Sequence, residues 1–169
     1  ILKPGPGVGG HCIAVDPWFI VSAAPKHSKL IQTARAINDA KPAWVIEKLE
    51  LKIVEYFSDH PSQKPSDLVV ACYGLAFKAD IDDLRESPAM DIVKRLIDLD
   101  VAEILIVEPN ISELPAIFAG IPKVQKTDMA QALASADVIV GLVDHKEFRK
   151  ITPEVLLGKV VMDTRGMWR

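Results

Sequence analysis

Cysteine is scarce in this chain, and its two cysteines lie in different sequence surroundings. Two cysteines in 169 residues cannot form the disulfide framework of a small secreted protein, so we expect a reducing compartment. Cys72 belongs to an apolar, β-type run, LVVACY at 68–73, and is interpreted as a core residue. Cys12 follows a glycine-rich stretch, so we expect it to serve a different purpose.

An excess of one charge and a long apolar run are also missing. The formal net charge is −3 with acids and bases interspersed, so we expect neither a nucleic-acid nor a membrane partner. No run approaches the ~18 apolar residues of a spanning helix, and no leader-like segment opens the chain. The first residue is not Met and lies inside a motif. We therefore expect a fragment of a cytoplasmic protein.

The chain does contain enough apolar residues, 49%, for one sizeable domain preceded by an arm. A polar, proline-rich stretch at 58–67 is the best boundary signal. We expect a loop-rich cysteine segment at 1–27, a long helix at 28–58 and a domain at 67–169.

Apolar runs alternate with helical patterns from residue 68 onward. Near-continuous apolar strands separated by helices indicate a parallel sheet covered on both faces. We therefore predict an α/β fold, a Rossmann-like parallel sheet flanked by helices, in which ligands bind at the carboxyl ends of strands. The predicted strands are 68–73, 103–107, 138–143 and 160–163, and the predicted helices are 89–99, 129–134 and a short one near 153–157.

The 28–58 segment shows helical spacing, and Ser28 is placed to cap it. Pro42 interrupts the pattern, which predicts either one kinked helix or two helices meeting near 39–41. Apolar residues also lie off the main stripe, so more than one side needs cover. Either a second chain or a neighbour within one subunit could provide it. The stripe is Leu30, Ala34, Ile37, Val45, Leu49, Ile53 and Tyr56, and the additional residues are Ile31, Trp44, Ile46, Leu51 and Val54.

A glycine-rich loop at 5–12 is the first candidate site. Four of the nine glycines fall within six positions, 5–10, and His11 and Cys12 follow them. Such a loop lets a ligand approach closely, and its N–H groups can hold an anion or a sugar hydroxyl. Cys12 is then a candidate nucleophile, with Asp16 four residues later. A flexible terminus with a buried cysteine is the alternative. Asp16-Pro17 is predicted to form a turn, followed by an apolar anchor at 18–21.

A second candidate site follows the first predicted strand, at 74–87. Lys78 offers a point charge that suits a phosphate, and Phe77 offers an apolar face for a base or a sugar. Arg85 adds a planar guanidinium whose donors form a fork. A solvated run of charges is the alternative. The block lacks the G-x-G-x-x-G pattern of dinucleotide sites. Glu108 occupies the position at which a Rossmann unit carries a ribose-binding acid. Because the glycine pattern is missing, we interpret Glu108 as part of the inherited fold architecture.

The remaining polar residues carry weaker signals. Arg165, after the last predicted strand, could contact a phosphate or form a structural ion pair. His27 and His145 show no partner signal. No second Cys/His pair lies at metal-ligand spacing from His11, Cys12 and Asp16, so we expect no metal site.

These two blocks together resemble a known family. G-x-G-G-H-C-x-x-x-D-P at 7–17 and GLAFK with DDLRES at 74–87 resemble the catalytic and C-terminal nucleotide-binding motifs of the UDP-glucose/GDP-mannose dehydrogenase family. The sequence of residues 9–19 is most similar to that of bacterial family members that act on UDP-N-acetylmannosamine. The resemblance covers essentially the whole chain, but only the C-terminal part of such an enzyme.

The resemblance implies an NAD-dependent, two-step oxidation of a sugar C6 alcohol to a carboxylate in polysaccharide biosynthesis. Cys12 would form a thiohemiacetal and then a thioester, and Asp16 would position water. The UDP-sugar would contact Phe77 and Lys78, with the loop glycines Gly7, Gly9 and Gly10. Arg85 would approach the NAD side, while Asp82 and Asp83 would shape the 74–87 loop.

The resemblance also implies a homodimer through the central helix. A lysine, an asparagine and the NAD-binding glycines would lie before residue 1, so this chain alone is expected to be inactive.

Other functions remain open at this point. The chain could be a non-catalytic nucleotide-binding module, or an oligomerisation fragment built on the 28–58 helix. It could also belong to a family member that acts on UDP-glucose, UDP-N-acetylglucosamine or GDP-mannose. Cys12 and Asp16 favour the enzyme, because a pure binder needs neither.

Overall fold

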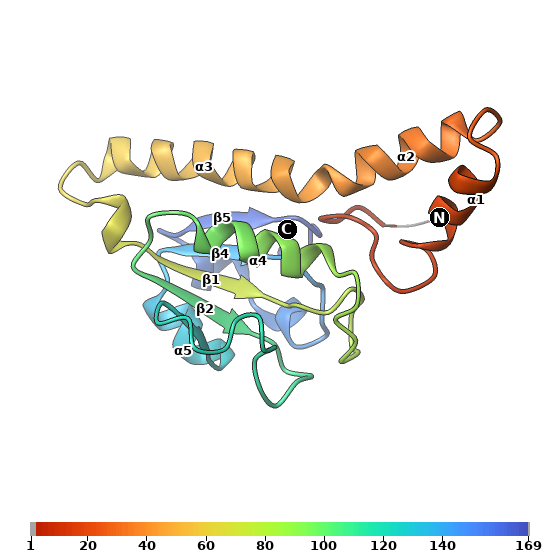
Figure 1. Ribbon diagram of the computed structural model, residues 1–169. Helices are drawn as coiled ribbons and strands as arrows, with labels where there is room; N and C mark the ends of the chain where they lie inside the picture. Colours follow the sequence, from red (N-terminus) through yellow and green to blue (C-terminus); the bar gives the residue numbers. More distant parts are fainter. Residues whose placement is uncertain (1–2, 169) are drawn as a thin grey trace.

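Five strands in residues 3–168, the part of the chain that the computed structural model describes, form one parallel sheet (Figure 1). Their order is β3-β2-β1-β4-β5, so the direction of winding reverses between β1 and β4. Helices cover both faces, which confirms the predicted Rossmann-like α/β fold. The strands are β1 (Val69–Tyr73), β2 (Glu103–Val107), β3 (Val124–Lys126), β4 (Val138–Gly141) and β5 (Val160–Asp163).

The register aligns the carboxyl ends of neighbouring strands. Tyr73, the last residue of β1, pairs with Val107 of β2 on one side and with Gly141 of β4 on the other. Gly141 in turn pairs with Asp163 at the end of β5. Loops that leave these strands therefore start from one edge of the sheet, where ligands bind in this class of fold.

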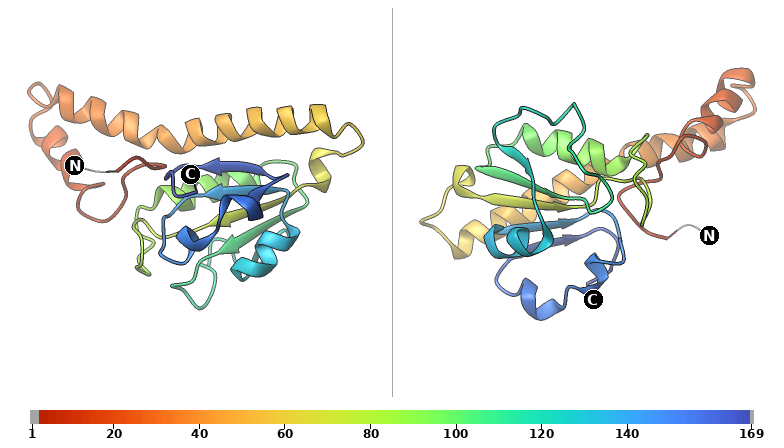
Figure 2. Two further views of the ribbon diagram at one scale, coloured as in Figure 1. Left: turned by 180° about the vertical axis from the view of Figure 1, so that it is seen from behind. Right: turned by 90° about the horizontal axis from the view of Figure 1, so that it is seen from below.

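Alternate side chains of each strand enter the cores on the two faces of the sheet. In β1, Val70 and Cys72 pack under α3 (Lys41–Asp59) and α4 (Pro88–Ile97). Ala71 and Tyr73 face α5 (Met129–Ser135) and two short 3-10 turns, η2 (Phe148–Lys150) and η3 (Pro153–Leu156). Figure 2 shows α5 and these turns on the side of the sheet opposite α3. Both faces are thus buried, as the continuous apolar strands require.

The long predicted helix is two helices that meet at Ala40. α2 (Lys29–Asp39) ends one residue before α3 begins, and Pro42 lies in the first turn of α3. Proline has no N–H, so the carbonyl of Asn38 loses its usual helical donor there. The second of the two predicted alternatives is confirmed. The two helices run on as one bent rod (Figure 1).

The apolar stripe has different surroundings in the two helices. In α3, Val45, Leu49 and Ile53 are buried against the sheet domain. In α2, Leu30 is 84% exposed and Ile37 is 66% exposed, because α2 extends past the edge of the sheet (Figure 1). Within one chain, the stripe is therefore buried only along α3.

Two local predictions about the helix ends and turns are wrong. Asp16-Pro17 opens helix α1 (Asp16–Ala23) and does not form a turn. Proline costs nothing at this point, because N–H groups in a first helical turn have no partner in the helix. Ser28 occupies the N-cap position of α2, but its hydroxyl donates backward to the carbonyl of Ala24 at 2.8 Å. It therefore does not cap α2.

Three predicted elements agree with the structure within two residues at each end. They are the helix predicted at 129–134 (α5), the helix predicted at 89–99 (α4) and the strand predicted at 103–107 (β2). The strand predicted at 138–143 stops at Gly141, and β3 was not predicted. Among the described residues, no helix has both the length and the apolar composition needed to cross a bilayer.

Candidate functional site

The glycine-rich loop lies directly on the 74–87 loop. The N–H of Gly10 donates to the carbonyl of Arg85 at 3.2 Å. A Cβ on Gly10 would stand 2.9 Å from the Phe77 ring, and one on Gly9 would stand 2.2 Å from the carbonyl oxygen of Glu86. Only glycine fits such an approach. The two segments that the sequence suggested separately therefore form one surface.

The glycines at 5–10 spell G-x-G-x-x-G, but their surroundings differ from a dinucleotide fingerprint. That fingerprint needs a strand before it and a helix directly after it. Here the described residues before Gly5 are not in a strand, and the next helix starts at Asp16. The missing Cβ atoms make room for Phe77, Pro88 and Arg165 of the same chain. The loop is thus built to pack on the domain.

A cavity of about 250 Å³ opens where the two loops meet. Cationic side chains enter it from separate parts of the chain: Lys3 before the glycine loop, Lys78 after β1 and Arg165 after β5. Gly7, Gly9 and Phe77 complete the part that the sequence predicted, together with Val8 and Ile13. A larger hollow of about 620 Å³ at the ends of β2 and β3 contains none of the predicted site residues.

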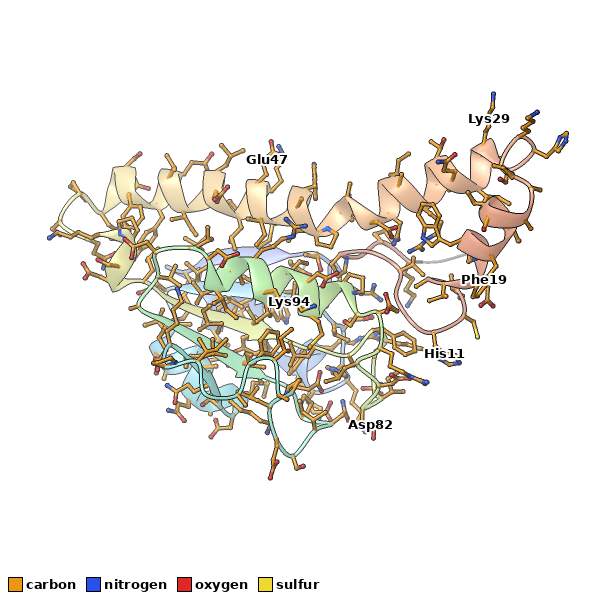
Figure 3. All side chains as sticks on the ribbon, viewed as in Figure 1. His11, Phe19, Lys29, Glu47, Asp82 and Lys94 are labelled. Atoms are coloured by element: carbon orange, nitrogen blue, oxygen red, sulfur yellow. The ribbon has the colours of Figure 1, made fainter. Side chains whose placement is uncertain are left out.

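Arg85 lies at the Cys12 end of the same surface. Its Nε and Nη2 donate to Asp83 at 2.9 and 2.6 Å, and this pairing lowers the pKa of Asp83 to about 2. Cys12 lies close enough to act electrostatically on Arg85, and His11 does the same to Asp83. Figure 3 labels His11 and Asp82, which mark the two loops at this corner. Asp83 also accepts the Phe77 N–H through its carbonyl, at 3.1 Å, and so shapes the loop.

Cys12 and Asp16 are brought together by the backbone. The Cys12 carbonyl accepts the N–H of Asp16 at 2.8 Å, so the turn that runs from Cys12 to Asp16 leads directly into α1, of which Asp16 is the first residue. Both side chains are exposed. Cys72 contrasts with Cys12, because it is fully buried in the sheet and burial raises its pKa to about 12. It is the core residue that the sequence predicted.

Glu108 and His145 form a buried pair that the sequence did not reveal. Both side chains are completely buried, and His145 Nε2 lies 3.1 Å from Glu108 Oε2. The sequence showed no partner signal for His145, and the structure supplies a partner in Glu108. Burial alone would raise the pKa of Glu108, but hydrogen bonds from His145, Leu75 and Asn110 outweigh it and lower the pKa. The signal that could have found the pair is position, because Glu108 follows β2 directly and His145 lies just beyond the end of β4.

Glu108 also binds the first backbone N–H groups of the loop that follows β1. Its Oε2 accepts the N–H groups of Leu75 and Ala76 at 2.7 and 3.2 Å. These are N–H groups just after β1, where a Rossmann fold holds a pyrophosphate. Because the carboxylate already satisfies them, these two N–H groups are not free to bind a pyrophosphate. Glu108 is then architecture, as the missing fingerprint suggested, and Arg85 remains the candidate NAD contact on this chain.

Comparison with known proteins confirms, along the whole chain, the family that the sequence resembles. Residues 71–169 match the UDP-binding domain of the UDP-glucose/GDP-mannose dehydrogenase family, and residues 1–40 match its central domain. The UDP-N-acetyl-D-mannosamine dehydrogenase of Yersinia pestis is 50% identical over 169 residues, all of this chain and 40% of that protein. An NDP-N-acetyl-D-galactosaminuronic acid dehydrogenase of Ralstonia nicotianae is 50% identical over 99% of this chain and 37% of its own length.

Solved structures of the family have the same fold. The UDP-N-acetyl-mannosamine dehydrogenase of Staphylococcus aureus is 36% identical, with a TM-score of 0.72 over 100% of this chain and 37% of its own. The Pyrococcus horikoshii UDP-D-ManNAc dehydrogenase is 30% identical, with a TM-score of 0.76 and the same coverage. The chain spans about 40% of the length of these relatives. Since the UDP-binding domain alone matches more than half of the residues, the chain belongs to the UDP-glucose/GDP-mannose dehydrogenase family.

Proposed function

We propose that this chain is the nucleotide-sugar-binding and cysteine-bearing part of an NAD-dependent 6-dehydrogenase. The proposed reaction oxidises UDP-N-acetylmannosamine to UDP-N-acetylmannosaminuronate. The choice of sugar is supported by the names of relatives that are 48–50% identical over the full chain. The proposal also includes a cytoplasmic enzyme, a homodimer and a role in polysaccharide biosynthesis.

The observation that carries the proposal is the 250 Å³ cavity between the glycine loop and the sheet edge. Lys3, Lys78 and Arg165 give it positive charge, which suits a diphosphate. The Phe77 ring and the aliphatic Ile13 provide apolar faces for a base or a sugar ring. Glycine N–H groups at its wall can serve sugar hydroxyls. This combination matches a nucleotide sugar better than a lone phosphate.

Cys12 is proposed as the nucleophile that makes the second oxidation possible. Its thiolate adds to the C6 aldehyde, so that a C–S bond forms and the carbonyl oxygen takes a proton to become a hydroxyl. Loss of a hydride and a proton from this thiohemiacetal leaves a thioester. Water, positioned by Asp16 from the same turn, then displaces the thiolate and releases the carboxylate. NAD supplies the hydride acceptor of both oxidations, and we propose that it is held mainly by residues outside these 169.

The homodimer is proposed from apolar side chains that stay uncovered on the bent α2–α3 rod and on α1. Large exposed apolar side chains gathered on neighbouring helices often mark a protein–protein interface. Ile46, which lies off the main stripe, is buried within the chain, but its companions Leu51 and Val54 are 51% and 64% exposed. A second copy is the proposed cover. The exposed residues are Trp18, Phe19, Ile20, Leu30, Ile37, Trp44, Leu51 and Val54.

Calorimetry on this chain tests the binding part of the proposal. UDP should release heat on titration, whereas NAD should give none, because Glu108 already binds the N–H groups after β1 that a pyrophosphate would need. Lys78→Ala should weaken UDP binding by about tenfold, as expected for one lost charge-assisted contact. Lys94→Ala is the matched control, since Lys94 lies on α4 (Figure 3) and does not line the cavity. Tight NAD binding without any UDP heat would overturn the proposal.

A further inference from the structure

His145 connects the ends of three strands through hydrogen bonds of its ring nitrogens. The ring is fully buried, and its Nε2 lies 3.1 Å from Glu108, which follows β2. Its Nδ1 accepts the backbone N–H of Asp80 at 2.8 Å and lies 3.1 Å from Asn110 Nδ2. Asp80 belongs to the loop after β1, and His145 itself to the loop after β4. The imidazole therefore ties the 74–87 loop to the neighbouring strand ends.

The partners of His145 determine its protonation. A backbone N–H can only donate, so Nδ1 must present a lone pair to Asp80. The ring proton is then on Nε2, where it is donated to Glu108, and the imidazole is neutral. Phe148 packs edge-on against the ring, with 5.2 Å between ring centroids. Ring orientation and tautomer are thus both fixed by the surroundings.

The bond to Asp80 falls at one of two strained positions of the 74–87 loop, the other being Glu86 with φ +51. Asp80 has φ +61, a left-handed conformation that costs energy for a residue with a side chain. Contacts must hold it there, and Asp80 has two: its N–H on His145, and its carboxylate, which accepts the Lys146 N–H at 2.9 Å. Asp80 lies two residues beyond Lys78. On the other side of Phe77–Lys78, the N–H groups of Leu75 and Ala76 are held by Glu108.

We propose that His145 is a positioning residue that, with Glu108, holds Phe77 and Lys78 in place for the nucleotide sugar. The inference rests on the proposed function, because it takes the Phe77–Lys78 cavity as the ligand site. Glu108 anchors the loop on the strand side of these two residues, and His145 anchors it on the far side. His145 lines no part of the cavity, so it acts through the backbone of Asp80.

Two substitutions separate the two halves of this connection. His145→Asn keeps an acceptor near the Nδ1 position, so Asp80 retains its partner while the bond to Glu108 is lost. His145→Gln keeps a donor near the Nε2 position for Glu108, but it leaves the Asp80 N–H without an acceptor. Glu108 keeps hydrogen bonds from Leu75, Ala76 and Asn110 in both variants. Asn is the smaller residue and leaves the larger void, so it should be the less stable variant.

The measurements are UDP affinity, thermal denaturation and amide hydrogen exchange of segment 75–87 without ligand. We expect His145→Gln to lose about tenfold in UDP affinity and to exchange faster at Asp80. His145→Asn should melt at a lower temperature, yet bind UDP more tightly than His145→Gln and keep Asp80 protected. This reversed order of stability and affinity is what a positioning role requires.

Other outcomes would overturn the inference and leave the proposed function distinguishable from it. If UDP affinity follows melting temperature in both variants, His145 is only a structural residue. If wild type binds UDP and His145→Gln binds it equally well, the positioning role is wrong while the ligand site stands. If wild type does not bind UDP, the proposed ligand site is wrong. The role of His145 as an anchor of Asp80 is tested separately, because slow hydrogen exchange at Asp80 in His145→Gln would reject it.

Discussion

The Asp144 carboxylate holds the Arg165 guanidinium at the edge of the cavity. Nε and Nη2 of Arg165 reach Oδ1 of Asp144 at 2.9 and 2.8 Å, and Arg149 pairs with Oδ2. Burial would raise the pKa of Asp144, but the two arginines outweigh it, so the pKa is lowered. The remaining nitrogen, Nη1, faces Gly5, where a Cβ would come within 2.2 Å. Arg165 thus forms the structural ion pair that the sequence left as one alternative and also lines the cavity, while the phosphate contact, the other alternative, stays a prediction.

Asp144→Asn tests whether this pair orients Arg165 for a diphosphate. If orientation matters, UDP affinity should fall about tenfold, because a guanidinium free to turn loses its geometry. If Asp144 only cancels charge, its removal should strengthen UDP binding, so the sign of the change decides. Calorimetry provides the measurement. Asp91→Asn, which removes an exposed partner of Lys94, is the control and should leave affinity unchanged.

Gly10→Ala should disturb the ligand site more than backbone strain alone explains. Gly10 and Gly120 both have positive φ, +91 and +78, but a Cβ at Gly120 meets nothing within 4 Å. Gly120→Ala should therefore cost only about 1 kcal/mol of conformational strain and leave UDP binding intact. Gly10→Ala adds a clash with the Phe77 ring, so the free energy of unfolding and UDP affinity should both fall. Equal UDP affinity in the two variants would refute the contact.

Acid should weaken the sheet edge through Glu108. Its pKa is lowered on folding, so its contribution to stability is present above the unfolded value of 4.5 and is lost as pH falls below it. Glu108→Gln should destabilise the chain at pH 7, because an amide cannot replace a carboxylate that accepts on both oxygens. The gap in melting temperature between wild type and Glu108→Gln should narrow toward pH 3. Glu113→Gln, at an exposed loop position, should follow wild type throughout.

The fold could be predicted largely because its strands are buried on both faces. Continuous apolar runs such as 103–107 leave little choice of structure, and β2 was placed correctly. β3 was missed because two of its three residues, Gln125 and Lys126, are exposed, so the sequence shows no apolar run that would predict a strand there. α1 was missed because Asp-Pro was interpreted as a turn, although proline also suits the first turn of a helix.

The candidate site divides in a similar way. Phe77 and Lys78 could be proposed because they follow a strand within one short motif. His145 and Asp144 could not, because their partners Asp80 and Arg165 are 65 and 21 residues away in sequence. Those pairs exist only once β4 lies between β1 and β5 in the sheet. Strand order, which one sequence does not give, was the missing information.

Charge on the outer face of α3 should break the proposed homodimer. Leu51→Glu replaces a side chain that is 51% exposed in the monomer, so it should leave folding intact while opposing apolar contact between copies. Sedimentation over a concentration series should show dimers for wild type and monomers for this variant. Leu157→Glu, at a residue 78% exposed beyond η3, should remain dimeric. Monomeric wild type at high micromolar concentration would argue against the interface.

The chemistry of Cys12 is best tested in a full-length enzyme carrying these residues, with Cys72→Ser as the control. Cys72 is buried and its thiol stays protonated, because burial raises its pKa to about 12. Cys72→Ser should therefore keep turnover and lose only stability, since a hydroxyl enters an apolar core. Asp16→Asn should slow hydrolysis, so that a thioester accumulates as added mass on the peptide containing Cys12.

Cys12→Ala should stop the reaction at the aldehyde or its hydrate. The first hydride loss needs no thiol, so one NADH per sugar should still appear. The second needs a tetrahedral adduct, which alanine cannot form. Cys12→Ser should stall with an adduct or give slow aldehyde formation, because a hydroxyl is a much weaker nucleophile than a thiolate at neutral pH. NADH yield per sugar, together with intact-protein mass, decides. Two NADH per sugar at a near-normal rate from Cys12→Ala would exclude the covalent route and leave the glycine loop a binding element only.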